Sequence, residues 1–199
     1  MNQMNEIVIA SRNQNKIKEY RKMFAEKGFN VKSTDDFLGI PTVKETGKTF
    51  EENATLKAEA MVRHTKLPVI ADDSGLEVKS LNNEPGIYSA RYAGDHDDQA
   101  NNRKLLSQLS NFKNRDAKFV TWIVMMKPNF DKLVVHGELN GEILKSKRGR
   151  NGFGYDPLFY VSSKKKSLAE MTMSEKNSIS HRGRALRKLL EKFDEFWDK

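Results

Sequence analysis

Residues 69–78 read Val-Ile-Ala-Asp-Asp-Ser-Gly-Leu-Glu-Val, and they are the most informative stretch of this 199-residue chain. The apolar residues Val69–Ala71 follow Pro68 and predict a short buried strand. We expect this strand to end at Asp72-Asp73-Ser74-Gly75. Ligands of open α/β sheets bind beyond the carboxyl ends of strands, and Mg²⁺ is usually held by one or two carboxylates plus substrate phosphates. The alternative is a solvated turn, because Asp, Ser and Gly are common turn residues.

Composition limits the class of protein. Hydrophobic residues make up 37% and charged residues 31% of the chain, which predicts one domain, or two closely merged lobes, with a sizeable core. The longest apolar runs, such as 122–126, fall far short of the roughly 18 residues of a membrane span. No export signal is recognised, so we expect a cytoplasmic protein. The absence of cysteine excludes disulfides, thiolate nucleophiles and cysteine-based zinc sites.

The chain is strongly basic. Its formal net charge is +8 and its estimated pI is about 9.5, which favours polyanionic partners such as nucleic acid, anionic membranes or phosphorylated small molecules. Lysine-rich surfaces also serve solubility alone, so the charge narrows the class of partner without identifying it. Basic runs occur at 145–150 and 164–166.

The first strand is expected at Glu6–Ala10, followed by the polar turn Ser11–Lys16 and a helix that stops near Gly28. Backbone N–H groups at a helix N-terminus can bind an anion, and the ammonium group of Lys16 would add a point charge for phosphate. The turn lacks the glycines of a P-loop. The alternative is that a side chain of the turn simply caps the helix. The turn considered alone favours this capping interpretation.

Further elements follow from periodicity and turn chemistry. Thr49–Glu52 is a capping-box pattern, and the helix after it should bury one face. We expect strands near 30–33 and at 117–126, a hairpin or two edge strands at 132–136 and 138–143 with Gly137 at the bend, and helices at 97–109 and from about Ser180 onward.

The loop Asn151–Pro157 carries a second candidate site. Its glycines allow close backbone approach, the rings of Phe153 and Tyr155 can stack on a nucleobase, and Asp156 offers acceptors to N–H groups. The alternative is a surface turn whose aromatic residues anchor it to the core, which spacing alone favours.

Five separated motifs occur in order along the chain. They are Ser11-x-Asn13-x-x-Lys16; Thr49-Phe50-x-Glu52-Asn53-Ala54; Ala71-Asp72-Asp73-Ser74-Gly75-Leu76; Pro85-Gly86-Ile87-Tyr88-Ser89-Ala90-Arg91-Tyr92; and Gly152-Phe153-Gly154-Tyr155-Asp156-Pro157 followed by Ser180-His181-Arg182. With this ordered set the chain closely resembles the inosine/xanthosine triphosphate pyrophosphatase family, from about residue 7 to residue 190.

The resemblance implies a fold and an activity. The fold would be α/β, one elongated domain over residues 1–199, with a central mixed sheet flanked by helices and two lobes with a cleft between them. Family members are typically homodimers that use Mg²⁺ to cleave ITP, dITP and XTP between the α- and β-phosphates. The products are the nucleoside monophosphate and pyrophosphate.

The resemblance also implies roles for residues. The triphosphate would be held by Ser11, Arg12, Asn13, Gln14, Asn15 and Lys16. Asp73 would be the general base and a metal ligand, with Ser74 beside the substrate. The base and neighbouring nucleotide groups would be bound by Phe153, Gly154, Tyr155, Asp156, Lys176, His181 and Arg182.

One departure concerns the metal. The family commonly has two adjacent acids before Thr-Gly, and here those positions are Lys44 and Glu45. A protonated lysine cannot bind Mg²⁺. Either Glu45 takes over as the metal ligand, or Asp72 and the phosphates suffice, or metal affinity is weakened.

Two other functions remain as alternatives. A basic nucleic-acid-binding module would show salt-dependent affinity and no nucleotide turnover. A related pyrophosphatase with a drifted base preference is the second, and Lys44 is its best sequence hint. With the family reading, we expect neither a membrane nor a stable nucleic-acid partner.

Overall fold

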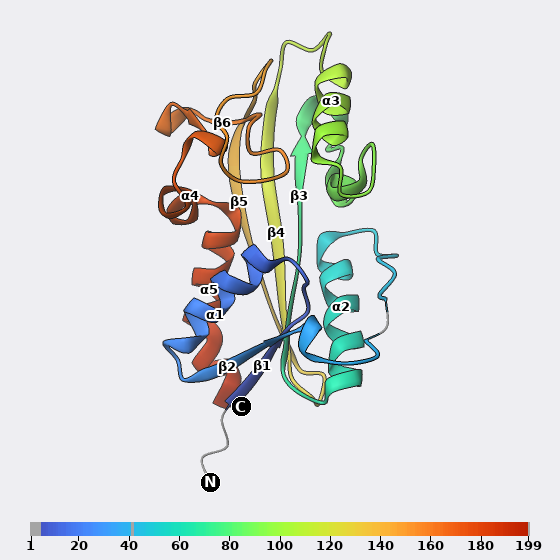
Figure 1. Ribbon diagram of the computed structural model, residues 1–199, viewed down its shortest axis with the longest axis vertical. Helices are drawn as coiled ribbons and strands as arrows, with labels where there is room; N and C mark the ends of the chain where they lie inside the picture. The colour runs from blue at the N-terminus through green and yellow to red at the C-terminus, as the bar shows by residue number, and fades with distance from the viewer. Residues whose placement is uncertain (1–4, 41, 199) are drawn as a thin grey trace. The chain divides into compact units, whose positions relative to one another are not determined.

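The computed structural model describes residues 5–40 and 42–198, apart from the side chain of Asn15. Seven strands form one sheet in the order β2-β1-β3-β4-β5-β6-β7 (Figure 1). The strands are β1 (Asn5–Ile9), β2 (Phe29–Ser33), β3 (Val69–Val78), β4 (Asp116–Met126), β5 (Lys132–Ile143), β6 (Phe159–Val161) and β7 (Lys166–Ser167). The helices are α1 (Gln14–Ala25), α2 (Phe50–Thr65), α3 (Asp98–Gln108), α4 (Met173–Ile179) and α5 (His181–Asp198).

The sheet is mixed, as expected for the α/β class. Strand β1 is parallel to β2 and β3, whereas β6 is antiparallel to β5 and β7. The chain divides into two compact units. The first comprises Met1–Asp73, Trp122–Val135 and Lys192–Lys199, and the second comprises Ser74–Thr121 and His136–Glu191.

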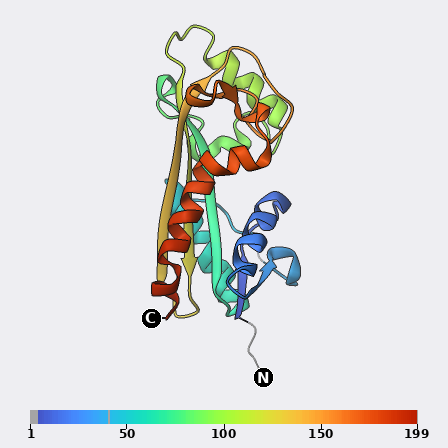
Figure 2. The ribbon, with the colours of Figure 1, turned by 90° about the vertical axis from the view of Figure 1, so that its left-hand side faces the viewer.

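The first unit has apolar packing on both faces of β1. Successive strand residues point to opposite faces, and Val8 packs with the buried face of α2, including Ala54, Ala58 and Met61. Its neighbours Ile7 and Ile9 are also buried. The helices α1 and α2 lie on opposite sides of this strand (Figures 1 and 2). An aromatic cluster joins α1, β2 and the end of α5 through Phe24, Phe29, Phe193 and Trp197.

The second unit is built around a separate core. Its members come from the second half of β3, from α3, from the ends of β4 and β5, and from the segment that precedes α4. They are Leu76, Val78, Tyr92, Leu105, Leu109, Ala117, Phe119, Leu139, Ile143, Tyr155, Leu158, Phe159, Val161, Leu168 and Met171. This core therefore anchors both α3 and the loop that follows residue 150.

Two strand predictions are wrong in an informative way. The strand that begins at Val69 does not end at Ala71 but continues to Val78, so Asp72-Asp73-Ser74-Gly75 lies within β3 and not in a turn. The reason is that Leu76 and Val78 beyond it are fully buried, and their burial keeps the chain extended through the polar residues.

The hairpin expected around Gly137 is also absent, because β5 is continuous from Lys132 to Ile143. A Cβ atom at Gly137 would meet the main-chain carbonyl of His181 and approach the nitrogen of Ala185 to 2.7 Å. The glycine thus marks the close approach of α5 and not a bend.

The other predicted elements agree with the structure, whereas α4, β6 and β7 were not predicted. The strands expected at 6–10, 30–33 and 117–126 are confirmed to within one residue at each end. Helix α4 was not predicted, although Thr172 and Glu175 form a capping box at its start. Among the described residues, no helix is long and apolar enough to cross a membrane.

The close approach at Gly137 yields a stability prediction. Gly137→Ala should lower the free energy of unfolding by about 1–3 kcal/mol, because the added methyl group has no space against the backbone of α5. Urea denaturation measures the change. Gly94→Ala is the matched control, because its added methyl group would lie 3.4 Å from the nearest atom, the Cβ of Asp97. Equal stability of the two variants would contradict the packing argument.

Candidate active site

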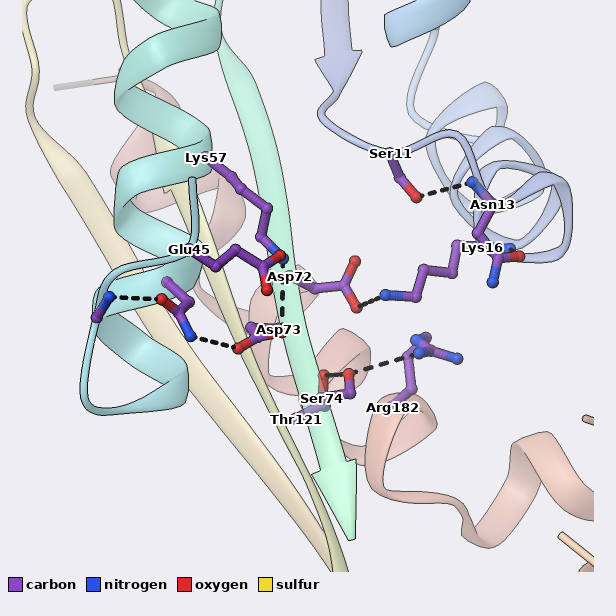
Figure 3. A network of polar contacts seen from close by, with 12 residues as sticks. Ser11, Asn13, Lys16, Glu45, Lys57, Asp72, Asp73, Ser74, Thr121 and Arg182 are labelled. Carbon is purple, nitrogen blue, oxygen red and sulfur yellow. Dashed lines mark hydrogen bonds and ion pairs between the residues drawn. The ribbon is translucent and has the colours of Figure 1, made fainter. Parts of the chain in front are cut away.

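In the first unit, Asp72 and Asp73 occupy consecutive positions of β3 and contact different lysines (Figure 3). The Nζ atom of Lys16 donates to Oδ2 of Asp72 at 2.7 Å. The side chain of Asp72 is 1% exposed and that of Lys16 is 17% exposed. The fold brings these residues together. Lys16 lies in the first turn of α1, which follows β1, and Asp72 lies in β3, the strand beside β1.

Asp73 is held from α2. Its Oδ2 accepts a hydrogen bond from Nδ2 of Asn53 at 3.3 Å, and its Oδ1 lies 3.5 Å from Nζ of Lys57. The same ammonium group lies 3.1 Å from Oε1 of Glu45. The other end of the Asn53 amide accepts the N–H of Gly47 at 2.9 Å, which ties the loop that carries Glu45 to α2. The ammonium group of Lys57 therefore contacts two carboxylates that come from different segments of the chain.

The charged side chains around Lys57 and Asp73 shift the pKa values of these two residues. Burial lowers the pKa of Lys57, but Asp73, Asp72 and Glu45 raise that pKa by more, so it ends above its ordinary value. Burial raises the pKa of Asp73, and the charge of Glu45 adds to the rise, whereas Lys57, Lys16 and Asn53 oppose it. The net shift of the Asp73 pKa is upward, which strengthens the ionised carboxylate as a base.

The turn before α1 shows the capping geometry. Oγ of Ser11 accepts the N–H of Asn13 at 3.1 Å, and Oδ1 of Asn13 accepts the N–H of Lys16 at 3.3 Å. Arg12 and Gln14 both turn toward Asp35, at 3.7 and 3.3 Å. Asn15 belongs to α1, but its side chain lies outside the described part of the chain. The capping interpretation is confirmed, and it leaves Lys16 as the member of the turn that reaches the Asp72 carboxylate.

In the second unit, Ser74 contacts Thr121 and Arg182. Its Oγ lies 2.5 Å from Oγ1 of Thr121, and an Nη atom of Arg182 donates to it at 3.5 Å. Thr121 is fully buried, and Arg182 is 7% exposed. A buried guanidinium beside two hydroxyl groups can bind an anionic or carbonyl oxygen in its neighbourhood.

The loop 152–156 forms the other group of the second unit. Oδ2 of Asp156 accepts the N–H of Phe153 at 2.9 Å and a hydrogen bond from Nζ of Lys176 at 2.5 Å. That ammonium group also lies 4.7 Å from the centre of the Phe153 ring. Phe153 is 39% exposed, so part of its side chain is available to a flat ligand.

Two other predicted side chains are packed inward. Tyr155 is buried, and its hydroxyl donates to the carbonyl of Ser89 at 2.9 Å. Burial also raises its pKa. For Tyr155 the core-anchor alternative therefore holds, in contrast to Phe153. The ring of His181 stacks on Phe119 with centres 4.9 Å apart.

Three residues that were not predicted as members of the candidate site are Lys57, Thr121 and Phe119, and Asn53 was given no role. A signal existed for Lys57, because a lysine on the apolar face of a helix is rarely buried without a partner. Asn53 lies one helical turn before Lys57 on that face. No sequence signal distinguishes Thr121 or Phe119, because their importance comes from the strand neighbours that the fold supplies.

Comparison with known proteins places this geometry in a family. A model of the Ham1 family matches residues 7–192. The chain is 56% identical over 195 residues to a Lactiplantibacillus plantarum protein named dITP/XTP pyrophosphatase, with 97% of this chain and 96% of that protein covered. A Bacillus cereus protein of the same name is 50% identical over 202 residues, with 99% and 98% covered.

Solved structures agree with the sequence matches. The Staphylococcus aureus Ham1 protein is similar with a TM-score of 0.88 and 49% identity, covering 96% of this chain and 98% of that one. A HAM1 protein from Coxiella burnetii gives a TM-score of 0.91 and 42% identity, covering 96% and 100%. The resemblance stated from the motifs is confirmed, and this chain belongs to the Ham1 family.

Proposed function

We propose that this protein hydrolyses the triphosphates of deaminated purine nucleosides, namely ITP, dITP and XTP, to the monophosphate and pyrophosphate. The observation that carries the proposal is the buried carboxylate of Asp73, held by Asn53 and Lys57 in a chain whose relatives are named dITP/XTP pyrophosphatase. The reaction removes these nucleotides from the pool used for nucleic-acid synthesis.

Asp73 acts as the general base. Its carboxylate takes a proton from a water molecule, whose oxygen forms a new bond to phosphorus while the bond to the bridging oxygen breaks. The electron pair of that bond leaves with pyrophosphate. The upward shift of the Asp73 pKa suits this task, and the hydrogen bond from Asn53 orients the carboxylate.

Two lysines supply positive charge for the phosphates. Lys16 lies in the first turn of α1, where the helix N-terminus also favours an anion. Lys57 keeps its charge because three carboxylates surround it. Charges that are already in place before the reaction stabilise the transition state without reorganisation.

The loop 152–156 and the start of α5 recognise the base. The exposed side of the Phe153 ring stacks on the purine, and the 6-oxo group accepts hydrogen bonds from donors among Lys176, His181 and Arg182. Adenine presents an amino group at that position and would offer these donors no acceptor. The loss of a paired acceptor is the kind of difference that gives strong discrimination.

The residues present fit a divalent cation. Glu45 and Asp73 both point at the ammonium group of Lys57 (Figure 3), so two carboxylates converge on one positive charge. Among the described residues, no group of three or more potential ligands is disposed for a metal. Two carboxylates plus substrate phosphates are a typical donor set for Mg²⁺, which would supply charge neutralisation. Lys44 is exposed, whereas Glu45 beside it reaches the ammonium group of Lys57, which supports Glu45 as the metal ligand of this loop.

The nucleic-acid alternative has less support. Arg148 pairs with Glu170 and Lys166 pairs with Glu175, each at 3.0 Å. Acidic partners thus neutralise part of both basic runs. The other alternative, a related pyrophosphatase with a drifted base preference, is a separate outcome of the pyrophosphate-release assay described next.

Pyrophosphate release tests the activity. With Mg²⁺ in excess, release should be fast from dITP and XTP and at least about 100-fold slower from dATP, whose 6-amino group replaces the acceptor. Guanine shares the 6-oxo group, so slow release from dGTP requires rejection of its 2-amino group. Asp73→Asn should lower kcat by about 100-fold or more, because the amide cannot accept the proton. Asp116→Asn, at an exposed position, should retain wild-type turnover. If no nucleotide releases pyrophosphate, the proposed enzymatic activity is refuted. A preference for dATP or dGTP would indicate a drifted base preference.

A Mg²⁺ titration tests the metal ligands. Chelation should abolish turnover, and Glu45→Gln should raise the Mg²⁺ midpoint about tenfold, because a charged oxygen donor is lost. Glu51→Gln is the matched control, since Glu51 pairs with Lys132 at 3.8 Å. An unchanged midpoint in Glu45→Gln would remove Glu45 from the metal site.

A homodimer and a cytoplasmic location complete the proposal, and both rest on the resemblance. Sedimentation equilibrium should give a mass of about twice the 22.8 kDa of one chain. A mass of one chain at assay concentration would rule the dimer out.

A further inference from the structure

The start of α3 holds the backbone of Gly154 on both sides. Oδ2 of Asp98 accepts the N–H of Gly154 at 2.7 Å, and Nδ2 of Asn102 donates to its carbonyl at 2.9 Å. Residues four apart on a helix share one face, so a single helical turn grips both polar groups of one residue. We call Asp98 and Asn102 the Gly154 clamp.

Helix α3 is itself firmly anchored. Oδ1 of Asn101 accepts the N–H of Ala93 at 2.6 Å, and its Nδ2 donates to the carbonyl of Ala90 at 3.2 Å. Leu105 and Leu109 are fully buried in the core of the second unit. The clamp therefore fixes Gly154 to a rigid support and not to another loop.

The buried amide of Asn102 carries an acceptor that is unpaired within the described part of the chain, which destabilises the fold and which a purely structural role would not require. It is 2% exposed, and its Nδ2 donates to both Asp98 and Gly154. Its Oδ1, however, has no hydrogen-bond partner among the described residues. An unpaired buried acceptor destabilises the folded state, because it has lost its hydrogen bonds to water. A leucine would avoid that cost but would leave the Gly154 carbonyl without this donor, so the amide serves the loop contact.

The clamped residue lies next to the ring assigned to base stacking. The backbone of Gly154 has φ +61°, and its N–H and C=O belong to the two peptide planes that flank its Cα. Holding both planes orients Phe153 on one side and Tyr155 on the other. The opposite end of the loop is held separately, through Asp156 and Lys176.

We propose that Asp98 and Asn102 are positioning residues for base recognition, an inference that rests on the proposed function. They touch neither the phosphates nor the reacting atoms. They set the direction of the Phe153 ring and thereby the depth at which the purine lies against the donors of α4 and α5.

Steady-state kinetics of two variants test the clamp. Asp98→Ala and Asn102→Leu should each raise KM for dITP about tenfold while kcat stays within about twofold, because base binding is loosened and the chemistry is not. The preference for dITP over dGTP should fall by a similar factor. The double variant should show less than the product of the two effects, because both residues hold the same glycine.

Two controls separate positioning from stability. Asp97→Ala removes the N-cap of α3, whose carboxylate accepts the N–H of Ala100 at 2.9 Å, so it should lower Tm without changing KM. Asp98→Asn retains an acceptor oxygen and should restore KM to near the wild-type value. Asp98 is exposed, so its variants should fold even if Asn102→Leu does not.

The outcomes are distinct. A wild-type enzyme that releases no pyrophosphate refutes the proposed function before any variant is compared. An active wild type, with Asp98→Ala lowering Tm like Asp97→Ala and leaving KM unchanged, overturns the clamp alone. A KM effect in Asp98→Ala that Asp98→Asn does not reverse also overturns it.

Discussion

The first unit depends on one half-buried cation. The ammonium group of Lys57 lies within 3.5 Å of both Glu45 and Asp73, which come from a loop and from β3. Removing one partner of such an ion pair is destabilising, because it leaves a charge that is largely shielded from solvent unpaired. Lys57 thus holds together the segments that carry the proposed base and metal ligand, and the acids in turn keep it charged.

Much of the fold could be predicted because local patterns and tertiary packing agree. Thr49 caps α2 by accepting the N–H of Glu52, as its spacing predicts. The failures occur where distant contacts override local chemistry. Asp72-Asp73-Ser74-Gly75 has turn composition but is held in a strand, and Gly137 resembles a bend only because its true neighbour, the start of α5, is 44 or more residues away in sequence.

The candidate site was predictable where motifs are contiguous and not where partners come from other elements. Asp73 and Lys16 stand out in the sequence, but the pairing of Lys16 with Asp72 requires the strand order. Tyr155 and Phe153 are both aromatic, yet Tyr155 is buried and bonded to Ser89, whereas Phe153 is partly exposed. Such differences depend on burial, which no spacing reveals.

The two acids of β3 also bear on how the sheet is aligned. Consecutive strand residues face opposite ways, and Asp72 meets Lys16 of α1 while Asp73 meets Lys57 of α2. Strand β3 pairs with β1 through Val8 opposite Val69 and Ile9 opposite Ile70. A slip by one residue would exchange the faces of every side chain and would leave one of the two lysines without its carboxylate, opposite Ala71 or Ser74. The two ion pairs therefore favour the observed register, because a misaligned strand would lose one of them in addition to its apolar packing.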